Sequence, residues 1–183
     1  MQRTVAVTAG VLPVVLAAAL LLYRAVGGAA AFILAVTCAT TAYHFYIRLA
    51  VGAALNAVMK NRADSTRPWY RVSRREMTFY KRIGVKHWKD KMPTYRRENF
   101  DCRAHSWDEI AQTTCQSELA HEINILFSFL PLLASLRIGA FWAFFITSLL
   151  SAVFDLMLVF VQRYNRARIL KMEQRRQATH PRG

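Results

Sequence analysis

Long apolar runs alternate with polar stretches along this chain. Four such runs are present, at about residues 4–23, 29–59, 119–136 and 140–161. Each is close to, or longer than, the roughly 20 residues that an α-helix needs to cross the hydrocarbon of a bilayer. Short turns at Gly27-Gly28 and at Gly139 separate the runs within each pair. The pattern therefore predicts an all-α integral membrane protein with four transmembrane helices.

The polar segment between the second and third runs, residues 60–116, is strongly basic. It holds fourteen Lys and Arg against seven Asp and Glu. It also carries three of the four tryptophans, and a disordered linker would not normally hold so many aromatic side chains. We predict a basic cytosolic subdomain of short helices, folded or lying at the membrane surface, with one helix over 74–82 that stops at Gly84. Ser106 and Glu109 resemble a capping box at the start of the helix that leads into the third run.

The predicted orientation follows from positive charge, which concentrates on the cytosolic side of membrane helices. The polar segment and the tail after residue 162 hold fourteen and seven Lys and Arg, whereas the two turns hold Arg24 and Arg137. We expect a multi-pass plasma-membrane protein with both termini in the cytosol. The predicted parts are residues 1–59 (helices 1 and 2), 60–117 (basic subdomain), 118–162 (helices 3 and 4) and 163–183 (basic tail).

The composition of the chain indicates which classes of molecule it is expected to bind. The net charge of +14 suits anionic lipid headgroups or phosphorylated substrates. Nucleic acid also attracts basic proteins, but these basic residues flank membrane segments, so we expect membrane lipids and no nucleic acid. Oligomeric state and cleavage of the first run as a signal peptide stay open.

A polar cluster opens the third run. Four polar side chains fall on one side of a helix there: Glu118, His121, Glu122 and Asn124. Ionisable groups in a membrane helix are a functional-site hypothesis by default. A histidine with a carboxylate one turn away can act as general base, so that an alcohol attacks an acyl carbonyl. Glu118 is the better-spaced partner of His121. The alternative is that the cluster fixes helix packing by pairing with Arg48 or the Arg163 region.

Three further features of the runs bear on the chemistry. His121-Glu122 begins an HExxH pattern, but Ile125 stands where the second histidine is needed, so no metal site is expected. Asp155 is a buried carboxylate in the fourth run. Arg48 is either a helix-end side chain reaching lipid phosphates or part of a substrate-facing wall.

The exit of the fourth run mixes guanidinium groups with Tyr164 and Asn165. Guanidinium groups match phosphate and carboxylate with paired hydrogen bonds. Arg163 and Arg166 are therefore candidates to grip the phosphates of a carrier such as coenzyme A, or a lipid phosphate. Trp88 with Lys89 offers a similar combination. The alternative for both is a membrane-interface anchor.

Three sequence blocks are similar to those of one family: Val85-Lys86-His87-Trp88-Lys89, Glu118-Leu119-Ala120-His121 and Gln162-Arg163-Tyr164-Asn165-Arg166-Ala167-Arg168. They resemble the glycosyl-diaponeurosporenoate acyltransferases of staphyloxanthin-type carotenoid synthesis, in order and spacing, over about residues 79–176. Ala167 and Asp155 depart from the proline and asparagine of that pattern, so the acceptor lipid and acyl donor stay open.

The resemblance implies a membrane acyltransferase that esterifies a sugar hydroxyl of a glycosylated carotenoid-type lipid with a fatty acyl chain. His121 would be general base, with Glu118 orienting it. Substrate or donor binding is expected of Trp88, Lys89, Gln162, Arg163, Tyr164, Asn165 and Arg166, and of the buried Asp155. The expected partners are a lipid-linked acceptor and an acyl donor, acyl-coenzyme A or acyl carrier protein, with no cofactor. The alternatives are a non-enzymatic membrane scaffold or transporter-like protein that uses the cluster for packing or proton coupling and, more weakly, a metal-dependent lipid hydrolase.

Overall fold

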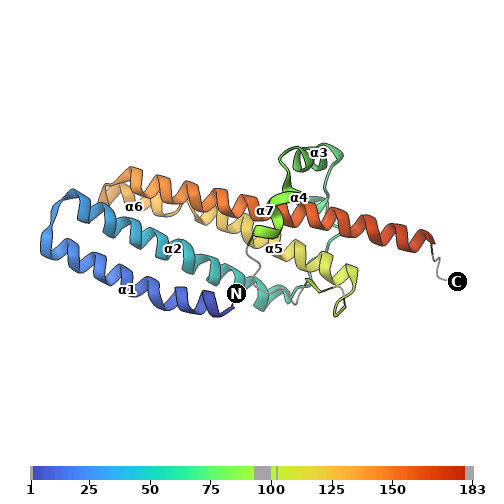
Figure 1. The fold of residues 1–183 in the computed structure, drawn as a ribbon, viewed down its shortest axis with the longest axis horizontal. Helices are drawn as coiled ribbons and strands as arrows, with labels where there is room; N and C mark the ends of the chain where they lie inside the picture. The colour runs from blue at the N-terminus through green and yellow to red at the C-terminus, as the bar shows by residue number, and fades with distance from the viewer. Residues whose placement is uncertain (1, 93–99, 102, 180–183) are drawn as a thin grey trace. The chain divides into compact units, whose positions relative to one another are not determined.

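Helices dominate the computed structural model, which describes residues 2–92, 100–101 and 103–179. The elements are α1 (Gln2–Val26), α2 (Gly28–Met59), η1 (Pro68–Tyr70), α3 (Arg74–Arg82), α4 (Val85–Trp88), η2 (Lys89–Lys91), α5 (Trp107–Phe127), α6 (Pro131–Ile138) and α7 (Phe141–Thr179) (Figure 1). Within these described ranges, four segments are long and apolar enough to cross a membrane: Arg3–Val26, Gly28–Met59, Trp107–Ile138 and Phe141–Arg176. No strand occurs among the described residues. The all-α class and the four candidate spans are confirmed.

Local capping signals place the helix starts of the polar segment. The Ser106 N–H donates to Glu109 Oε2 at 2.8 Å, and the Glu109 N–H donates to Ser106 Oγ at 3.2 Å. The predicted capping box is therefore present, directly before α5. Helix α3 has the predicted bounds and begins at a second capping box, between Ser73 and Glu76. Gly84 takes the left-handed φ of +68° between α3 and α4, a conformation that favours glycine.

Two helices extend beyond the apolar runs that predicted them. Helix α5 begins at Trp107, ahead of the apolar run that starts near residue 119, and α7 continues from Val161 to Thr179. Hydrophobicity marks only the part of a helix that suits lipid. The polar continuations carry the charged residues of the candidate site.

The chain divides into two compact units, each built from segments that are distant in sequence. Unit 1 comprises Met1–Ala53 and Glu122–Leu156, and unit 2 comprises Ala54–His121 and Met157–Gly183. The domain boundaries expected from the sequence stay a prediction.

In unit 1, Pro131 interrupts the third span between α5 and α6. Proline has no N–H, so the carbonyl four residues earlier loses its usual helical donor. That carbonyl belongs to Phe127, and the Tyr43 hydroxyl of α2 donates to it at 3.0 Å. The Leu130 N–H also donates to this carbonyl, at 3.2 Å, so the hydroxyl from the neighbouring helix adds a second hydrogen bond in place of the one that the proline removes.

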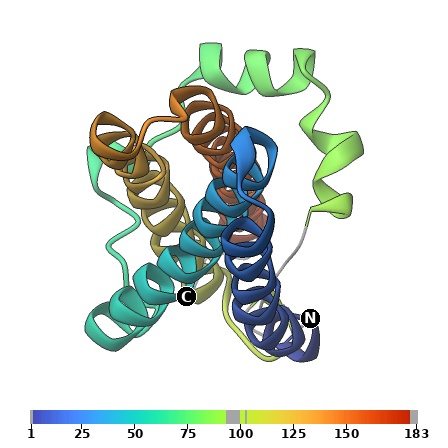
Figure 2. The ribbon, with the colours of Figure 1, turned by 90° about the vertical axis from the view of Figure 1, so that its left-hand side faces the viewer.

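Pro13 creates the same need in α1, and a second tyrosine of α2 meets it. The carbonyl four residues before Pro13 belongs to Ala9, and the Tyr46 hydroxyl donates to it at 2.6 Å. Figures 1 and 2 both show α1 and the first part of α2 running side by side. Helix α2 therefore serves a proline-freed carbonyl on each of two neighbouring segments.

An internal ion pair joins α2 to α7 within unit 1. Arg48 donates to Asp155 Oδ2 from Nε at 3.0 Å and from Nη2 at 2.7 Å, and to Ser151 Oγ at 2.8 Å. Asp155 is fully buried, whereas the Arg48 side chain keeps 24% exposure. Ser151 Oγ also lies 2.8 Å from Oγ of Ser128, the residue that directly follows α5. The Arg48 guanidinium therefore faces α7 within this unit.

This ion pair predicts a non-additive response to substitution. Asp155→Leu should destabilise the detergent-solubilised protein by about 2–3 kcal/mol, because it leaves a mostly buried guanidinium without its carboxylate. That estimate lies below the range for fully buried pairs because Arg48 is partly exposed. Adding Arg48→Met should recover most of the loss in a thermal unfolding measurement. If the double variant loses as much stability as the two single variants lose when their losses are added, the two side chains do not stabilise each other and the prediction is wrong.

Candidate functional site

Glu118 lies at the centre of a buried charged cluster in unit 2. It is fully buried on α5, and both carboxylate oxygens accept hydrogen bonds from α7. Oε1 accepts from Arg163 Nη1 at 2.5 Å, and Oε2 accepts from Arg166 Nη1. Because burying a carboxylate is costly unless it is paired and hydrogen-bonded, the two arginines account for its position. The structure brings together three of the residues singled out in the sequence.

Arg163 uses its complete set of hydrogen-bond donors on protein groups. A guanidinium has five N–H groups. They reach Glu118, both carboxylate oxygens of Glu76 (2.5 and 3.3 Å), the Trp69 carbonyl (3.2 Å) and the Arg71 carbonyl (3.1 Å). A phosphate could bind Arg163 only in exchange for one of these bonds.

Arg166 is also engaged by the protein. It is fully buried, and its Nε and Nη2 donate to the Tyr70 carbonyl at 3.1 and 2.6 Å. Its guanidinium carbon lies 5.3 Å from the centroid of the Tyr70 ring, a cation–π arrangement. Arg166 thus ties the η1 turn and α5 to α7. Its predicted contact with donor phosphates stays a prediction.

Glu76 links α3 to the same cluster. Burial raises the pKa of the Glu76 carboxyl, but hydrogen bonds from Arg163 and Tyr80 outweigh it, so the pKa lies below its usual value. The pKa of the Tyr80 hydroxyl is raised, first by burial and then by the bond that it donates to Glu76. At neutral pH Glu76 is therefore ionised and Tyr80 protonated. Two carboxylates and two guanidinium groups balance each other here.

His121 follows Glu118 by three residues on α5 and is partly exposed. Residues at this spacing neighbour each other on a helix surface. Gln162, next to Arg163 on α7, has its Oε1 buried without a hydrogen-bond partner among the described residues. An unsatisfied buried acceptor of this kind needs an explanation, and a substrate hydroxyl is one. The roles of His121 and Gln162 stay predictions.

The predicted residues Trp88 and Tyr164 share an apolar cluster in unit 2. Tyr164 is buried with Tyr80, Val85 and Val161, and Trp88 packs against this cluster. Trp88 Nε1 donates to the Ile83 carbonyl at 3.1 Å. These contacts hold α3 and α4 against α7.

Two of the remaining predicted residues in unit 2 have simpler surroundings. Lys89 Nζ lies 3.4 Å from Asp90 Oδ1, and Asn165 is half-buried. Asp155 belongs to unit 1, where Arg48 binds it. Its contact with substrate stays a prediction. Within the described ranges, no group of three His, Cys, Asp or Glu side chains is placed to hold a metal ion.

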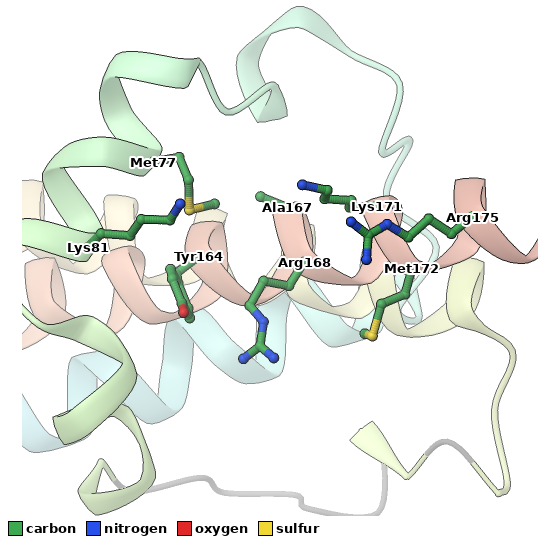
Figure 3. Close-up of a pocket in the computed structure, with 8 residues that line it drawn as sticks. All are labelled: Met77, Lys81, Tyr164, Ala167, Arg168, Lys171, Met172 and Arg175. Atoms are coloured by element: carbon green, nitrogen blue, oxygen red, sulfur yellow. The ribbon is translucent and has the colours of Figure 1, made fainter.

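A basic pocket lies between α3 and α7 of unit 2 (Figure 3). Its volume is about 380 Å³, and eight residues line it: Met77, Lys81, Tyr164, Ala167, Arg168, Lys171, Met172 and Arg175. The described lining includes four cationic side chains and no carboxylate. The pocket and the Glu118 cluster adjoin along α7, since Tyr164 directly follows Arg163.

The sequence of this region also identifies a family. Residues 66–175, well over half of the chain, match the family model for glycosyl-4,4'-diaponeurosporenoate acyltransferase. The chain belongs to the glycosyl-4,4'-diaponeurosporenoate acyltransferase family. No curated protein and no solved structure matches the chain. Membership confirms the resemblance seen in the three sequence blocks.

The part that matches this acyltransferase family contains the whole charged cluster and the basic pocket. It begins just before η1 and ends at Arg175, the last residue that lines the pocket. Helices α1 and α2 precede it. The match therefore covers most of unit 2 and the α5 to α7 part of unit 1.

Sequence reasoning about this acyltransferase missed two groups of residues. Glu76 was not singled out, although its place in a capping motif and its charge made it a candidate partner for an arginine. The pocket residues on α7 were detectable, because Tyr164, Arg168, Lys171 and Arg175 recur at spacings of four, three and four and so share one helix face. Only the structure places Lys81 of α3 opposite that face.

Proposed function

We propose that this protein transfers a fatty acyl group to a sugar hydroxyl of a glycosylated carotenoid-type lipid in the membrane. The observation that carries the proposal is the family match over residues 66–175. It includes both Glu118-Leu119-Ala120-His121 and Gln162-Arg163-Tyr164-Asn165-Arg166. The pairing of α5 with α7 through Glu118 and Arg163 supports the idea that these two blocks form one site.

His121 is the general base in this proposal. Its imidazole takes the proton of the acceptor hydroxyl as the hydroxyl oxygen attacks the acyl carbonyl carbon of an activated donor. A new carbon–oxygen ester bond forms, the bond from the carbonyl carbon to the donor's leaving group breaks, and that group departs with a proton. The buried Oε1 of Gln162 is available to accept a hydrogen bond from a second hydroxyl of the acceptor.

The arginines act mainly through position in this scheme. Because their hydrogen bonds to protein groups are extensive, we assign Arg163 and Arg166 the role of fixing α5 and η1 against α7. Glu118 then sets the place of the helical turn that carries His121. Lys89, Tyr164 and Asn165 remain candidate contacts of the donor or acceptor. The proposed donor is an activated fatty acyl thioester.

The proposed location is the plasma membrane, with both termini and the basic segment 60–116 in the cytosol. The distribution of Lys and Arg supports this orientation. An acyl thioester made in the cytosol would then meet the acceptor lipid at the membrane surface.

One observation favours a second candidate, a membrane scaffold without catalysis. The Glu118 cluster pairs carboxylates with guanidinium groups, which is the arrangement expected of a packing device. On this alternative His121 has no chemical role, and its removal changes assembly or stability instead of lipid chemistry.

Mass spectrometry of membrane lipids tests the proposed function. Cells that carry the gene should contain a glycolipid heavier by one acyl group than the species that accumulates when the gene is deleted. Restoring the gene should restore the heavier lipid. An identical lipid profile with and without the gene would refute the acyltransferase proposal and support the scaffold.

A further inference from the structure

Helix α3 runs across α7 within unit 2. Figures 1 and 2 together show α3 crossing the line of α7 instead of running along it. Helix α7 belongs to a candidate membrane span, Phe141–Arg176. A helix that crosses such a span lies along the membrane surface, as interfacial helices do. One side of α3 then faces the bilayer.

Contacts with α7 show which side of α3 faces the apolar run. The centroid of the Phe79 ring lies 5.7 Å from that of Phe160, which stands at the end of the run that finishes near residue 161. Lys81 lies on another side of α3 and lines the pocket whose α7 residues run from Tyr164 to Arg175 (Figure 3). The side with Phe79 therefore faces the apolar run, and the side with Lys81 faces the polar continuation of α7.

Two apolar side chains on the Phe79 side of α3 are exposed. Phe79 is 46% exposed and Ile83 is 37% exposed. The Ile83 N–H donates to the Phe79 carbonyl at 3.0 Å, so Ile83 continues the last helical turn and lies beside Phe79. From Phe141 to Phe160, α7 is about 30 Å long at 1.5 Å per residue, which matches the hydrocarbon thickness of a bilayer. Phe79, and Ile83 beside it, are therefore at the level where hydrocarbon meets lipid headgroups.

Two arginines border this apolar pair. Arg75 precedes Phe79 by four residues and Arg82 follows it by three, so both neighbour Phe79 on the helix surface. Both are exposed. No ion pair among the described residues involves either of them. Arginine side chains beside apolar groups at this level can place their charge among lipid phosphates.

Carboxylates of α3, and of α7 in unit 2, do not neutralise these two arginines. Glu76, on α3 itself, accepts hydrogen bonds from Arg163. Glu173 lies on the C-terminal part of α7, about 20 Å beyond Phe160 along the helix axis and away from the apolar run. Exposed apolar side chains thus stand beside uncompensated positive charge, the combination that binds anionic lipid surfaces.

We propose that α3 is an interfacial helix that binds the anionic phospholipid surface of the leaflet next to the basic segment. Phe79 and Ile83 insert at the boundary between headgroups and acyl chains, and Arg75 and Arg82 bind lipid phosphates. This contact goes beyond the proposed function and does not depend on it. Because α3 also carries the carboxylate that Arg163 binds, the lipid surface supports one side of the charged cluster.

Fluorescence quenching by lipid tests which side of α3 meets the bilayer. Ile83→Trp and Lys81→Trp are each made in the full-length protein, in nanodiscs with or without bromine in the upper part of the lipid acyl chains. Both positions are exposed, so neither change leaves a cavity. Bromine should remove roughly half or more of the emission that Ile83→Trp adds to that of the native tryptophans, because this side chain reaches the acyl chains. Lys81→Trp is the matched control on another side of the same helix and should be quenched much less.

The charge of the bound lipid is tested in the Ile83→Trp protein. Bromine is carried only by phosphatidylglycerol or, at the same mole fraction, only by phosphatidylcholine, and quenching should be stronger with phosphatidylglycerol. Arg75→Glu with Arg82→Glu should lower this preference about fivefold or more, because two attractions become repulsions. Arg74→Glu with Lys81→Glu makes the same charge change in the same two turns, on the side away from Phe79, and should keep most of the preference.

The outcomes of these measurements decide the proposal. Stronger quenching at position 83 than at 81, with a phosphatidylglycerol preference that only the Arg75 and Arg82 changes remove, would confirm it. Equal quenching at the two positions would overturn it, because α3 would then have no membrane-facing side. Equal loss of lipid preference in the two charge-reversed pairs would also overturn it, since Arg75 and Arg82 would then add nothing beyond net charge. If Ile83→Trp is shielded from water-soluble acrylamide but not quenched by brominated lipid, a protein partner covers this side of α3 and the proposal is wrong.

Discussion

Replacing His121 with alanine is expected to lower acyl transfer by about 10²–10⁴-fold, the usual contribution of a positioned general base. Expression, membrane insertion and thermal stability should remain close to those of the unmodified protein, because His121 is only partly buried at the surface of α5. The measurement is the amount of acylated glycolipid formed per amount of membrane-inserted protein. A variant that acylates normally would show that another group removes the proton.

His105→Ala is the matched control for this experiment. His105 lies just before α5, and its Nδ1 lies 3.6 Å from Oε2 of Glu109 in the first turn of that helix. The same side chain is deleted within the same segment, yet acyl transfer should be unchanged. Equal loss of activity in both variants would point to a general disturbance of α5.

Replacing Glu118 with alanine is expected to cost about 3–5 kcal/mol of stability, as for other buried ion pairs that lose one partner. Arg166 is fully buried and would keep its charge without the carboxylate that faces it. Thermal unfolding of the detergent-solubilised protein measures the loss. Asp108→Ala removes an exposed carboxylate from the same helix and should have a small effect. Equal shifts for the two variants would refute the central place of Glu118.

Glu118→Gln separates packing from catalysis. Glutamine keeps the shape and can still accept one hydrogen bond, so part of the folded protein should survive. If Glu118 orients His121 or sets its basicity, the acyl-transfer rate per folded molecule falls and its pH profile shifts. If Glu118 only packs α5 on α7, the rate per folded molecule and the pH profile stay the same.

The membrane architecture was predictable because its signals are local. Apolar length defines a span, and a serine followed three residues later by glutamate marks a helix start, as at Ser106. Gly84 likewise ends the α3 region through its own backbone preference. Each of these features is decided by residues that are neighbours in the chain.

The partners of buried charges were not predictable, because they depend on which helix faces meet. The polar face that holds Glu118 was visible, and pairing with the Arg163 region was one of two alternatives. The sequence pattern did not indicate that Arg163 donates hydrogen bonds to Glu76, or that Arg48 forms an ion pair with Asp155. These contacts join residues between 87 and 107 positions apart. Spacing along one helix carries no information about them.

The two tyrosines of α2 that serve proline-freed carbonyls also define how far the helices can slide. Tyr46 reaches Ala9 and Tyr43 reaches Phe127, each at a single height along the helix axis. A displacement by one turn, about 5.4 Å, would carry each hydroxyl away from the carbonyl that a proline has left without its usual N–H donor four residues later. Lipid-facing apolar surfaces are nearly indifferent to such sliding. The prolines, usually regarded as breaks, thus give otherwise uniform membrane helices fixed points at which their translational register is set.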